Sequence, residues 1–267
     1  MVKLVDMIKY PYKDIKKSVV ESLKPLIKSD DKYHVGHARR HARTIEILLE
    51  NGISGKVLEL GASYVIPLAL EKLKPDLEFY ITEFDESKPK SGKTVLGESL
   101  EVESYSIDLE SEPIPAPNDF FDFIICSEVV EHMDVDPMYM MSEINRVLKV
   151  GGTLVLTTPN ACSTQSIWKI LRGYEPYFYM QYQKDRNPYR HNYEYSPLSL
   201  NILLKASGFS GQVWTEDSFE DRVMEDVTKL RAMGYPLEDK NIGDNIFSVS
   251  KKVSEVVDRY PRPIYDS

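Results

Sequence analysis

The stretch Lys56–Ser63, Lys-Val-Leu-Glu-Leu-Gly-Ala-Ser, decides the fold of this chain. Within it, the apolar run Val57–Leu60 carries one carboxylate, Glu59, and predicts a buried strand. Gly61 then permits a sharp turn, and apolar residues recur at helical spacing over residues 65–73. Strands that pass through a glycine turn into a helix present backbone N–H groups to cofactors in α/β folds. The stretch therefore predicts a cofactor site at the end of the first strand of a sheet.

Strands and helices alternate through much of the remaining chain. Besides 56–60, strands are expected at residues 79–84, 102–107, 121–126, 153–158, 211–214 and 246–250, with helices near 64–73 and 136–148. This alternation predicts an α/β fold with a Rossmann-like, doubly wound and mostly parallel sheet of seven strands. Residues 1–54 are expected to form a helical segment that covers the cofactor pocket, and residues 55–267 to form the main domain.

A dense cluster of histidine and arginine, Tyr33–His41, lies in the N-terminal segment. Three interpretations stay open for this cluster: a phosphate site, a cover for the cofactor pocket, or a solvated helix face.

Residues 161–195 interrupt the alternation with an aromatic and basic insertion. Seven tyrosines, Trp168 and Phe178 are interleaved there with Arg172, Arg186, Arg190 and His191. We expect this insertion to lie as a lid over the carboxyl edge of the sheet. Tyr and Trp next to Arg make platforms for sugars or bases, and the same side chains also suit the packing of a lid.

Composition narrows the class of protein. The chain has 267 residues, of which 42% are hydrophobic and 28% charged, with a net charge of −9. An acidic balance argues against a broad nucleic-acid surface, which needs a basic stripe. Two cysteines, Cys126 and Cys162, make no disulfide framework, so we expect a reducing, cytoplasmic compartment. We expect no signal segment and no membrane insertion, because no apolar run reaches about 18 residues.

Five motifs resemble, in order and spacing, those of class I S-adenosylmethionine-dependent methyltransferases. They are Val57–Gly61, Thr82–Ser87, Ile107–Leu109, Phe120–Glu128 and Leu148–Asn160. The resemblance covers roughly residues 55–160, with a weaker similarity at 191–209, and it implies S-adenosylmethionine as the cofactor. A nicotinamide-binding fold is the competing interpretation, but the chain lacks the G-x-G-x-x-G fingerprint that it needs.

The resemblance also implies which residues bind the cofactor. Gly61 with its neighbours Glu59 and Ala62 would hold the methionine moiety, Asp108 would face the adenine, and Ser127 would border the pocket from the fourth strand. The family's first motif usually has two or three glycines, and this chain keeps only Gly61, although the following small residues still allow close approach.

Two acids compete for the ribose diol. Glu83 and Asp85 lie two residues apart at the end of the second strand and therefore share a face. Either carboxylate could accept from both hydroxyls, and the resemblance favours Asp85.

A second cluster, Glu128, Glu131 and His132, follows the fourth predicted strand. If a helix starts there, the three side chains lie at i, i+3 and i+4 on one face of a turn. Two carboxylates and an imidazole suit a divalent cation, Mg²⁺ or Mn²⁺, with His191 as a further ligand. This pattern resembles methyltransferases that modify the 2′-hydroxyl of small RNAs and those of ubiquinone biosynthesis, in which a metal holds the acceptor hydroxyl. Without a metal, His132 or His191 is the expected general base.

These observations predict an S-adenosylmethionine-dependent O-methyltransferase. The expected acceptor is a hydroxyl of a sugar, a glycan or a glycosylated small molecule, because the aromatic insertion with its arginines suits a polar ligand. RNA 2′-O-methylation and N-methylation of a small molecule are the alternatives within the enzyme class. A cofactor-binding module without turnover is the alternative outside it. The sequence makes no prediction of oligomeric state.

Overall fold

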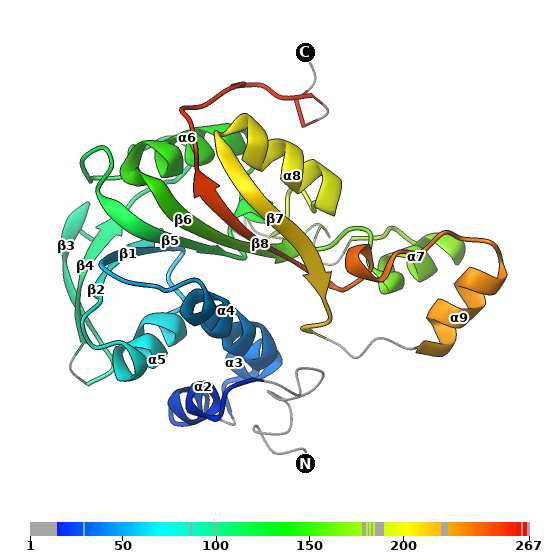
Figure 1. Cartoon of the computed structure of the whole chain (residues 1–267), viewed down its shortest axis with the longest axis horizontal. Coiled ribbons are helices and arrows are strands. Elements are labelled where there is room, and N and C mark those ends of the chain that lie inside the picture. The colour runs from blue at the N-terminus through cyan, green and yellow to red at the C-terminus, as the bar shows by residue number, and fades with distance from the viewer. Residues whose placement is uncertain are drawn as a thin grey trace.

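The computed structural model describes residues 15–28, 30–85, 87–98, 100–177, 180, 182, 184, 190–219, 224–262 and 264–265. Within these residues, eight strands form one sheet in the order β3-β4-β2-β1-β5-β6-β8-β7 (Figure 1). The strands are β1 (Lys56–Leu60), β2 (Glu78–Glu83), β3 (Ser91–Leu96), β4 (Leu100–Ser106), β5 (Phe121–Ser127), β6 (Leu148–Pro159), β7 (Phe209–Glu216) and β8 (Asn245–Lys252).

The centre of the sheet is parallel, as the sequence predicts. Strands β4, β2, β1, β5 and β6 pair in parallel, whereas β8 runs antiparallel to both β6 and β7. All seven predicted strands are present, with boundaries shifted by a few residues. Strand β3 was not predicted. It pairs antiparallel with β4 at the edge of the sheet and is mostly exposed, so it lacks the apolar alternation that would have marked it.

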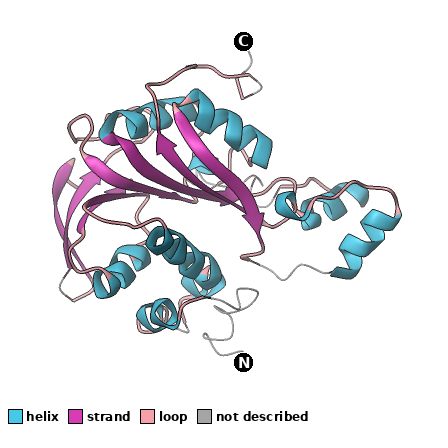
Figure 2. Cartoon of the chain, in the orientation of Figure 1, coloured by secondary structure: helices cyan, strands magenta, loops and turns pink. Residues whose placement is uncertain are grey.

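Helices cover both faces of the sheet (Figure 2). The described helices are α2 (Lys17–Leu23), α3 (Lys32–Gly36), α4 (Ala38–Glu50), α5 (Val65–Leu73), α6 (Pro137–Val147), α7 (Thr164–Leu171), α8 (Pro197–Ala206) and α9 (Met224–Ala232), with 3₁₀ turns η1 (Val130–His132) and η2 (Asp239–Asn241). Helices α2, α4 and α5 lie on one face, and α6 and α8 on the other, while α7 and α9 lie together beyond one end of the sheet (Figure 1). No described helix is long and apolar enough to cross a membrane.

The side chains of β1 alternate between the two faces of the sheet and contribute to a separate apolar core on each face. Val57 packs in the core with α2, α4 and α5, whereas Leu58 and Leu60 pack in the core with α6 and α8. Successive side chains of a strand point to opposite faces. Glu59 therefore shares the face of Val57 and is directed towards the layer that contains α4.

Side-chain caps position the helices next to the carboxyl edge. Asp136 accepts from the Tyr139 N–H at the start of α6, where Pro137 occupies the first turn. Ser163 caps α7 in the same way. The chain returns to the sheet at a bridge between Asn160 and Tyr195. Both ends of the predicted insertion are thus attached beside the end of β6.

Candidate functional site

The turn after β1 is built around Gly61. Its φ is +59°, and a Cβ placed there would lie 2.8 Å from Cγ2 of Val129, so a larger residue would be strained and crowded. The N–H of Gly61 donates to Thr82 Oγ1 (3.0 Å), and that of Ala62 to the Thr82 carbonyl (2.9 Å). These two N–H groups therefore fix the turn to β2 and are not offered to a cofactor, contrary to the expectation from the sequence.

Glu59, near the end of β1, has one carboxylate oxygen with a hydrogen-bond partner and one without among the described residues. Its side chain is buried, and Ser63 Oγ donates to Oε1 at 2.6 Å. The second oxygen, Oε2, is buried without a hydrogen-bond partner among the described residues. Burial raises the pKa of Glu59 to about 7. A buried acceptor without a partner costs about 1–3 kcal/mol, so a donor group of a bound ligand would stabilise this carboxyl.

The two acids after β2 differ in their surroundings. Glu83 accepts from Tyr64 Oη, Ser104 Oγ and Lys88 Nζ. Burial opposes the charge of Glu83, but these donors prevail and lower its pKa. Asp85 accepts from the backbone N–H and hydroxyl of Ser87, lies 3.9 Å from Lys88 Nζ, and has 40% of its side chain exposed. Asp85 is the more accessible of the two, and its role at a ribose stays a prediction.

Asp108 and Ser127 lie at the same edge of the sheet. Asp108 Oδ1 accepts from the Glu110 N–H, and Oδ2 accepts from Ser111 Oγ. The hydroxyls of Ser127 and Thr157 lie 2.9 Å apart at the ends of β5 and β6. The carboxyl ends of parallel strands meet at one edge, and every predicted cofactor residue is found there. Their binding roles stay predictions.

The predicted helical turn at Glu128 is wrong. Glu128 has a left-handed backbone (φ +56°), and the following turn, η1, is a 3₁₀ helix. Its side chain consequently diverges from Glu131 and His132. Glu128 Oε1 accepts from Thr157 Oγ1 and Asn245 Nδ2, both at 3.0 Å, and Oε2 forms an ion pair with Arg40 Nη1 at 2.8 Å. Glu128 is therefore a structural anion and not a member of the cluster predicted around it.

Glu131, His132 and His191 do come together, as predicted. Ligand atoms of these three side chains lie within 4.8 Å of one another, and the two imidazole centroids are 5.0 Å apart. The returning chain is held because the N–H groups of Asn192 and Tyr193 donate to the Glu131 carbonyl. This backbone contact brings His191, which is 59 residues from His132 in the sequence, back to the cluster.

Hydrogen bonds fix the tautomers of both imidazoles. His191 Nδ1 lies 2.9 Å from Glu194 Oε1, and His132 Nδ1 lies 3.1 Å from the Arg190 carbonyl. Since a carbonyl or carboxylate oxygen only accepts, we assign the proton to Nδ1 in each ring. The Nε2 atoms then carry the lone pairs. Burial, with a smaller contribution from His191, lowers the pKa of His132, which is neutral at pH 7.

Glu131 is buried completely. Thr158 Oγ1 donates to Oε2 at 3.0 Å, whereas Oε1 is buried without a hydrogen-bond partner among the described residues. Burial raises the pKa of this carboxyl well above its usual range. The cluster therefore combines a buried carboxyl, one of whose oxygens has no hydrogen-bond partner among the described residues, with two imidazoles that each carry one basic nitrogen.

Arg40 is one of two residues of this site that the sequence did not single out. It extends from α4 with only 2% of its side chain exposed, and it interacts electrostatically with Glu59 and Glu131 as well as Glu128. Burial lowers its pKa, but a guanidinium stays protonated in proteins. Glu194 was also missed, although its position three residues after His191 was visible. Arg40 lay inside a noticed cluster, but nothing in the sequence indicated its partners.

The neighbouring histidines contact one another and the backbone of their own segment, and the phosphate interpretation of this cluster stays a prediction. His34 Nδ1 lies 3.3 Å from His41 Nε2, and His37 Nδ1 lies 2.6 Å from the Tyr33 carbonyl. Burial lowers the pKa of His37 to about 4 and that of His41 well below its usual value. These rings are uncharged near neutral pH and offer little attraction to an anion.

Several solved structures are similar to this one. An S-adenosylmethionine-dependent methyltransferase from Archaeoglobus fulgidus has a TM-score of 0.54 at 16% identity, covering 84% of this chain and 100% of its own. A possible histamine N-methyltransferase from Thermotoga maritima has a TM-score of 0.53 at 16% identity, covering 87% and 98%. A putative methyltransferase from Bacillus halodurans has a TM-score of 0.50 at 16% identity, covering 80% and 99%. At these identities the similarity shows the fold alone.

A comparison with curated proteins finds no match. A family model described as a methyltransferase domain matches residues 38–212, more than half of the chain. The matched range includes α4 with Arg40, the turn at Gly61 and the cluster of Glu131, His132 and His191. The chain therefore belongs to the methyltransferase-domain family and is a class I S-adenosylmethionine-dependent methyltransferase.

Proposed function

We propose that this protein transfers the methyl group to a hydroxyl oxygen of a sugar, a glycan or a glycosylated small molecule. The pair His191–Glu194 is the single observation that carries the proposal. A buried carboxyl 2.9 Å from Nδ1 orients the imidazole and stabilises the imidazolium that forms when Nε2 takes a proton. A hydroxyl needs such a base, whereas a neutral amine already offers its lone pair.

Bound S-adenosylmethionine supplies a methyl carbon activated by its positive sulfur. The residues of the chain position the hydroxyl and remove its proton. The hydroxyl oxygen bonds to the methyl carbon while the carbon–sulfur bond breaks and its electron pair passes to sulfur. His191 Nε2 takes the hydroxyl proton. His132 lies beside it and lines the acceptor position with a neutral ring.

The same three side chains also fit a divalent cation. Glu131 offers a buried oxygen without a hydrogen-bond partner, and His132 and His191 offer Nε2 atoms. A cation held there would lower the pKa of the acceptor hydroxyl. We favour the metal-free base because the His191–Glu194 pair accounts for proton removal by itself. Full activity after exhaustive chelation supports the base, and activity that is lost on chelation and restored by Mg²⁺ or Mn²⁺ supports the cation.

Charge, free thiols and the buried cluster bear on the other candidate acceptors and on a binding module without turnover. The net charge of −9 counts against an RNA acceptor. Both cysteines are free thiols, which supports a cytoplasmic protein. A binding module without turnover would need neither the His191–Glu194 pair nor the buried cluster around Glu131.

His191→Asn tests the proposal. Asn keeps a polar side chain but cannot take the proton, so we expect turnover to fall by about 10²–10⁴-fold. Affinity for S-adenosylmethionine in calorimetry should stay within about twofold. The assay follows S-adenosylhomocysteine release over a panel of sugars and glycosides. A variant that keeps full turnover on the best acceptor would refute His191 as the base, and native protein that binds cofactor without turnover on any acceptor would favour the binding module.

A further inference from the structure

Three charged side chains lie together where β2 ends, at the edge of the sheet that the cofactor is expected to occupy. Glu83 is the last residue of the strand, and Asp85 and Lys88 follow it. Lys88 Nζ lies 2.6 Å from Glu83 Oε2 but 3.9 Å from Asp85 Oδ2. The ammonium therefore donates a hydrogen bond to Glu83 and lies beyond hydrogen-bond distance of Asp85.

Glu83 is held in the position from which it binds Lys88. Ser104 Oγ donates to Oε1 at 2.9 Å, and Tyr64 Oη donates to Oε2 at 3.1 Å. The Glu83 side chain is 13% exposed, whereas that of Lys88 is 44% exposed. The carboxylate is consequently the fixed member of the pair, and the lysine, on its flexible four-carbon stem, is the member that can reorient.

The backbone of Tyr64 is strained where this contact is made. Its φ is +61°, a left-handed conformation that is unfavourable for a bulky residue and that persists where surrounding contacts enforce it. The N–H groups of Gly61 and Ala62 bond to Thr82, and Tyr64 Oη bonds to Glu83, so the strained turn is attached to the end of β2. Burial, with a contribution from Glu83, raises the pKa of Tyr64, and its hydroxyl therefore stays protonated and donates at neutral pH.

Asp85 keeps one carboxylate oxygen open. Ser87 donates its N–H and its hydroxyl to Oδ1, at 3.0 and 2.6 Å, and these bonds lower the pKa of Asp85 more than Lys88 does. Oδ2 accepts no hydrogen bond from a residue that the structure describes. A ribose diol donates two hydrogen bonds and needs an acceptor position for each. Oδ2 is the oxygen nearest to Lys88, so an ammonium bound there would take one of these positions.

We propose that Glu83 is a positioning residue for the cofactor: it holds the Lys88 ammonium away from Asp85, which leaves Asp85 open to the ribose diol of S-adenosylmethionine. Glu83 acts through Asp85 and need not touch the cofactor. The inference rests on the ribose role predicted for Asp85, and it is independent of the acceptor atom that is methylated. When the charge of Glu83 is removed, Lys88 reorients towards Oδ2 of Asp85 and competes with the diol.

Calorimetry with S-adenosylhomocysteine tests this competition, because that ligand carries the ribose diol without the positive sulfur. Glu83→Gln should weaken its binding by about threefold to fivefold at low salt, the range that one exposed ion pair supplies. The loss should shrink in about 1 M NaCl, where charges more than about 3 Å apart are screened. Adding Lys88→Gln to Glu83→Gln should restore the native affinity to within about twofold, because the competing ammonium is then absent.

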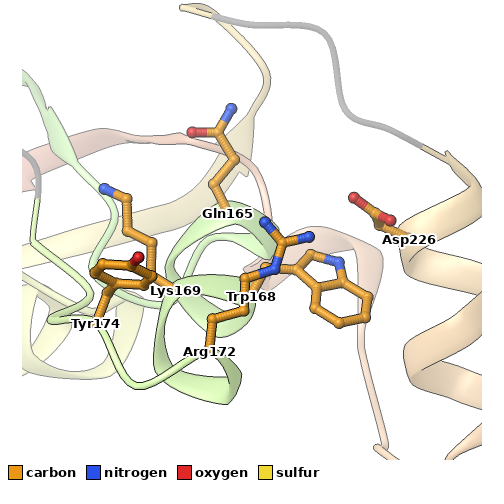
Figure 3. Close-up of a pocket in the computed structure, with 6 residues that line it drawn as sticks. All are labelled: Gln165, Trp168, Lys169, Arg172, Tyr174 and Asp226. Carbon is orange, nitrogen blue, oxygen red and sulfur yellow. The ribbon is translucent and has the colours of Figure 1, made fainter.

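Lys169→Gln is the matched control, because it removes the same charge far from β2. Figure 3 shows Lys169 on α7 among the side chains that line a cavity, and Figure 1 places α7 at the opposite end of the molecule from β2. Glu83→Gln/Lys169→Gln should bind as weakly as Glu83→Gln. In protein that already carries Asp85→Ala, Glu83→Gln should change the affinity no further, because Glu83 acts through Asp85.

Native affinity in Glu83→Gln, or a double variant with Lys88→Gln that binds as weakly as Glu83→Gln, would overturn the positioning role. An equal rescue by Lys169→Gln would also overturn it, because net charge would then explain the loss. A folding defect in Glu83→Gln would not be repaired by Lys88→Gln, so it counts against the proposal. Native affinity in Asp85→Ala would reject the ribose assignment and the inference with it. None of these measurements involves methyl transfer, so turnover on the acceptor panel tests the proposed function separately.

Discussion

Replacing Arg40 with Gln probes the contact that joins the N-terminal helices to the catalytic edge of the sheet. Arg40 is 2% exposed and its partner Glu128 is 9% exposed, with 2.8 Å between Nη1 and Oε2. Removing one member of a buried ion pair leaves an uncompensated charge and costs about 3–5 kcal/mol. Glu128 would keep its hydrogen bonds from Thr157 and Asn245. We therefore expect a loss near the lower end, about 3 kcal/mol.

The assay is urea unfolding at pH 7.5, compared with Lys93→Gln, which breaks the exposed pair between Lys93 and Glu101. The control should lose no more than about 1 kcal/mol. The double variant Arg40→Gln/Glu128→Gln should recover part of the loss, because both charges are then absent. A loss in Arg40→Gln as small as the control's, or a double variant less stable than Arg40→Gln alone, would refute this account of the contact.

Three further predictions concern the cofactor edge. The pKa of Glu59 in the folded protein, about 7, lies above the ordinary value of 4.5. The contribution of this carboxyl to stability is therefore complete below about pH 4.5 and is lost as the pH rises through 7. This loss lowers the free energy of unfolding by roughly 3 kcal/mol. Urea unfolding of Glu59→Gln between pH 5 and 8 should show a smaller decline than native protein, with the part due to the buried Glu131 remaining, and an unchanged decline would assign it to a group other than Glu59. Asp85→Ala should weaken S-adenosylmethionine binding by at least tenfold in calorimetry, with Glu83→Gln as the comparison; equal affinity in Asp85→Ala and native protein would reject Asp85 at the ribose. Gly61→Ala should destabilise the fold by about 1–2 kcal/mol, because φ is +59° and the new Cβ would lie too close to Val129. Gly151→Ala also has a positive φ but no neighbouring atom within 4 Å, so it should destabilise the fold less. A larger loss in Gly151→Ala than in Gly61→Ala would contradict the role given to Val129.

The sequence predicted those strands, turns and helices whose conformation is set by residues close together in the chain. Strand β1, the turn at Gly61 and helix α5 follow one another within 18 residues, and each has its own periodicity or turn residue. Strand β3 was not predicted because its side chains are mostly exposed, so its sequence lacks the alternation of apolar and polar residues that marks a half-buried strand.

The site was predicted less completely because its geometry depends on distant contacts. The left-handed backbone of Glu128 has no signature in a residue type that rarely adopts it. Its pairing with Arg40 spans 88 residues, and no periodicity connects the two. His191 was predicted as a further ligand of this cluster from its residue type, although no local pattern connects it to His132 across 59 residues. Glu194 was overlooked because a carboxylate in a loop looks like an ordinary solvated charge.

The most direct test follows the methyl group itself. Protein is incubated with S-adenosylmethionine labelled with ¹³C in the methyl group and with a panel of sugars and glycosides, and the product is examined by NMR. The account predicts a labelled methyl bonded to oxygen, formed by native protein and at least a hundredfold more slowly by His191→Asn. A label bonded to nitrogen, or an oxygen-bound label formed equally fast by His191→Asn, would contradict it.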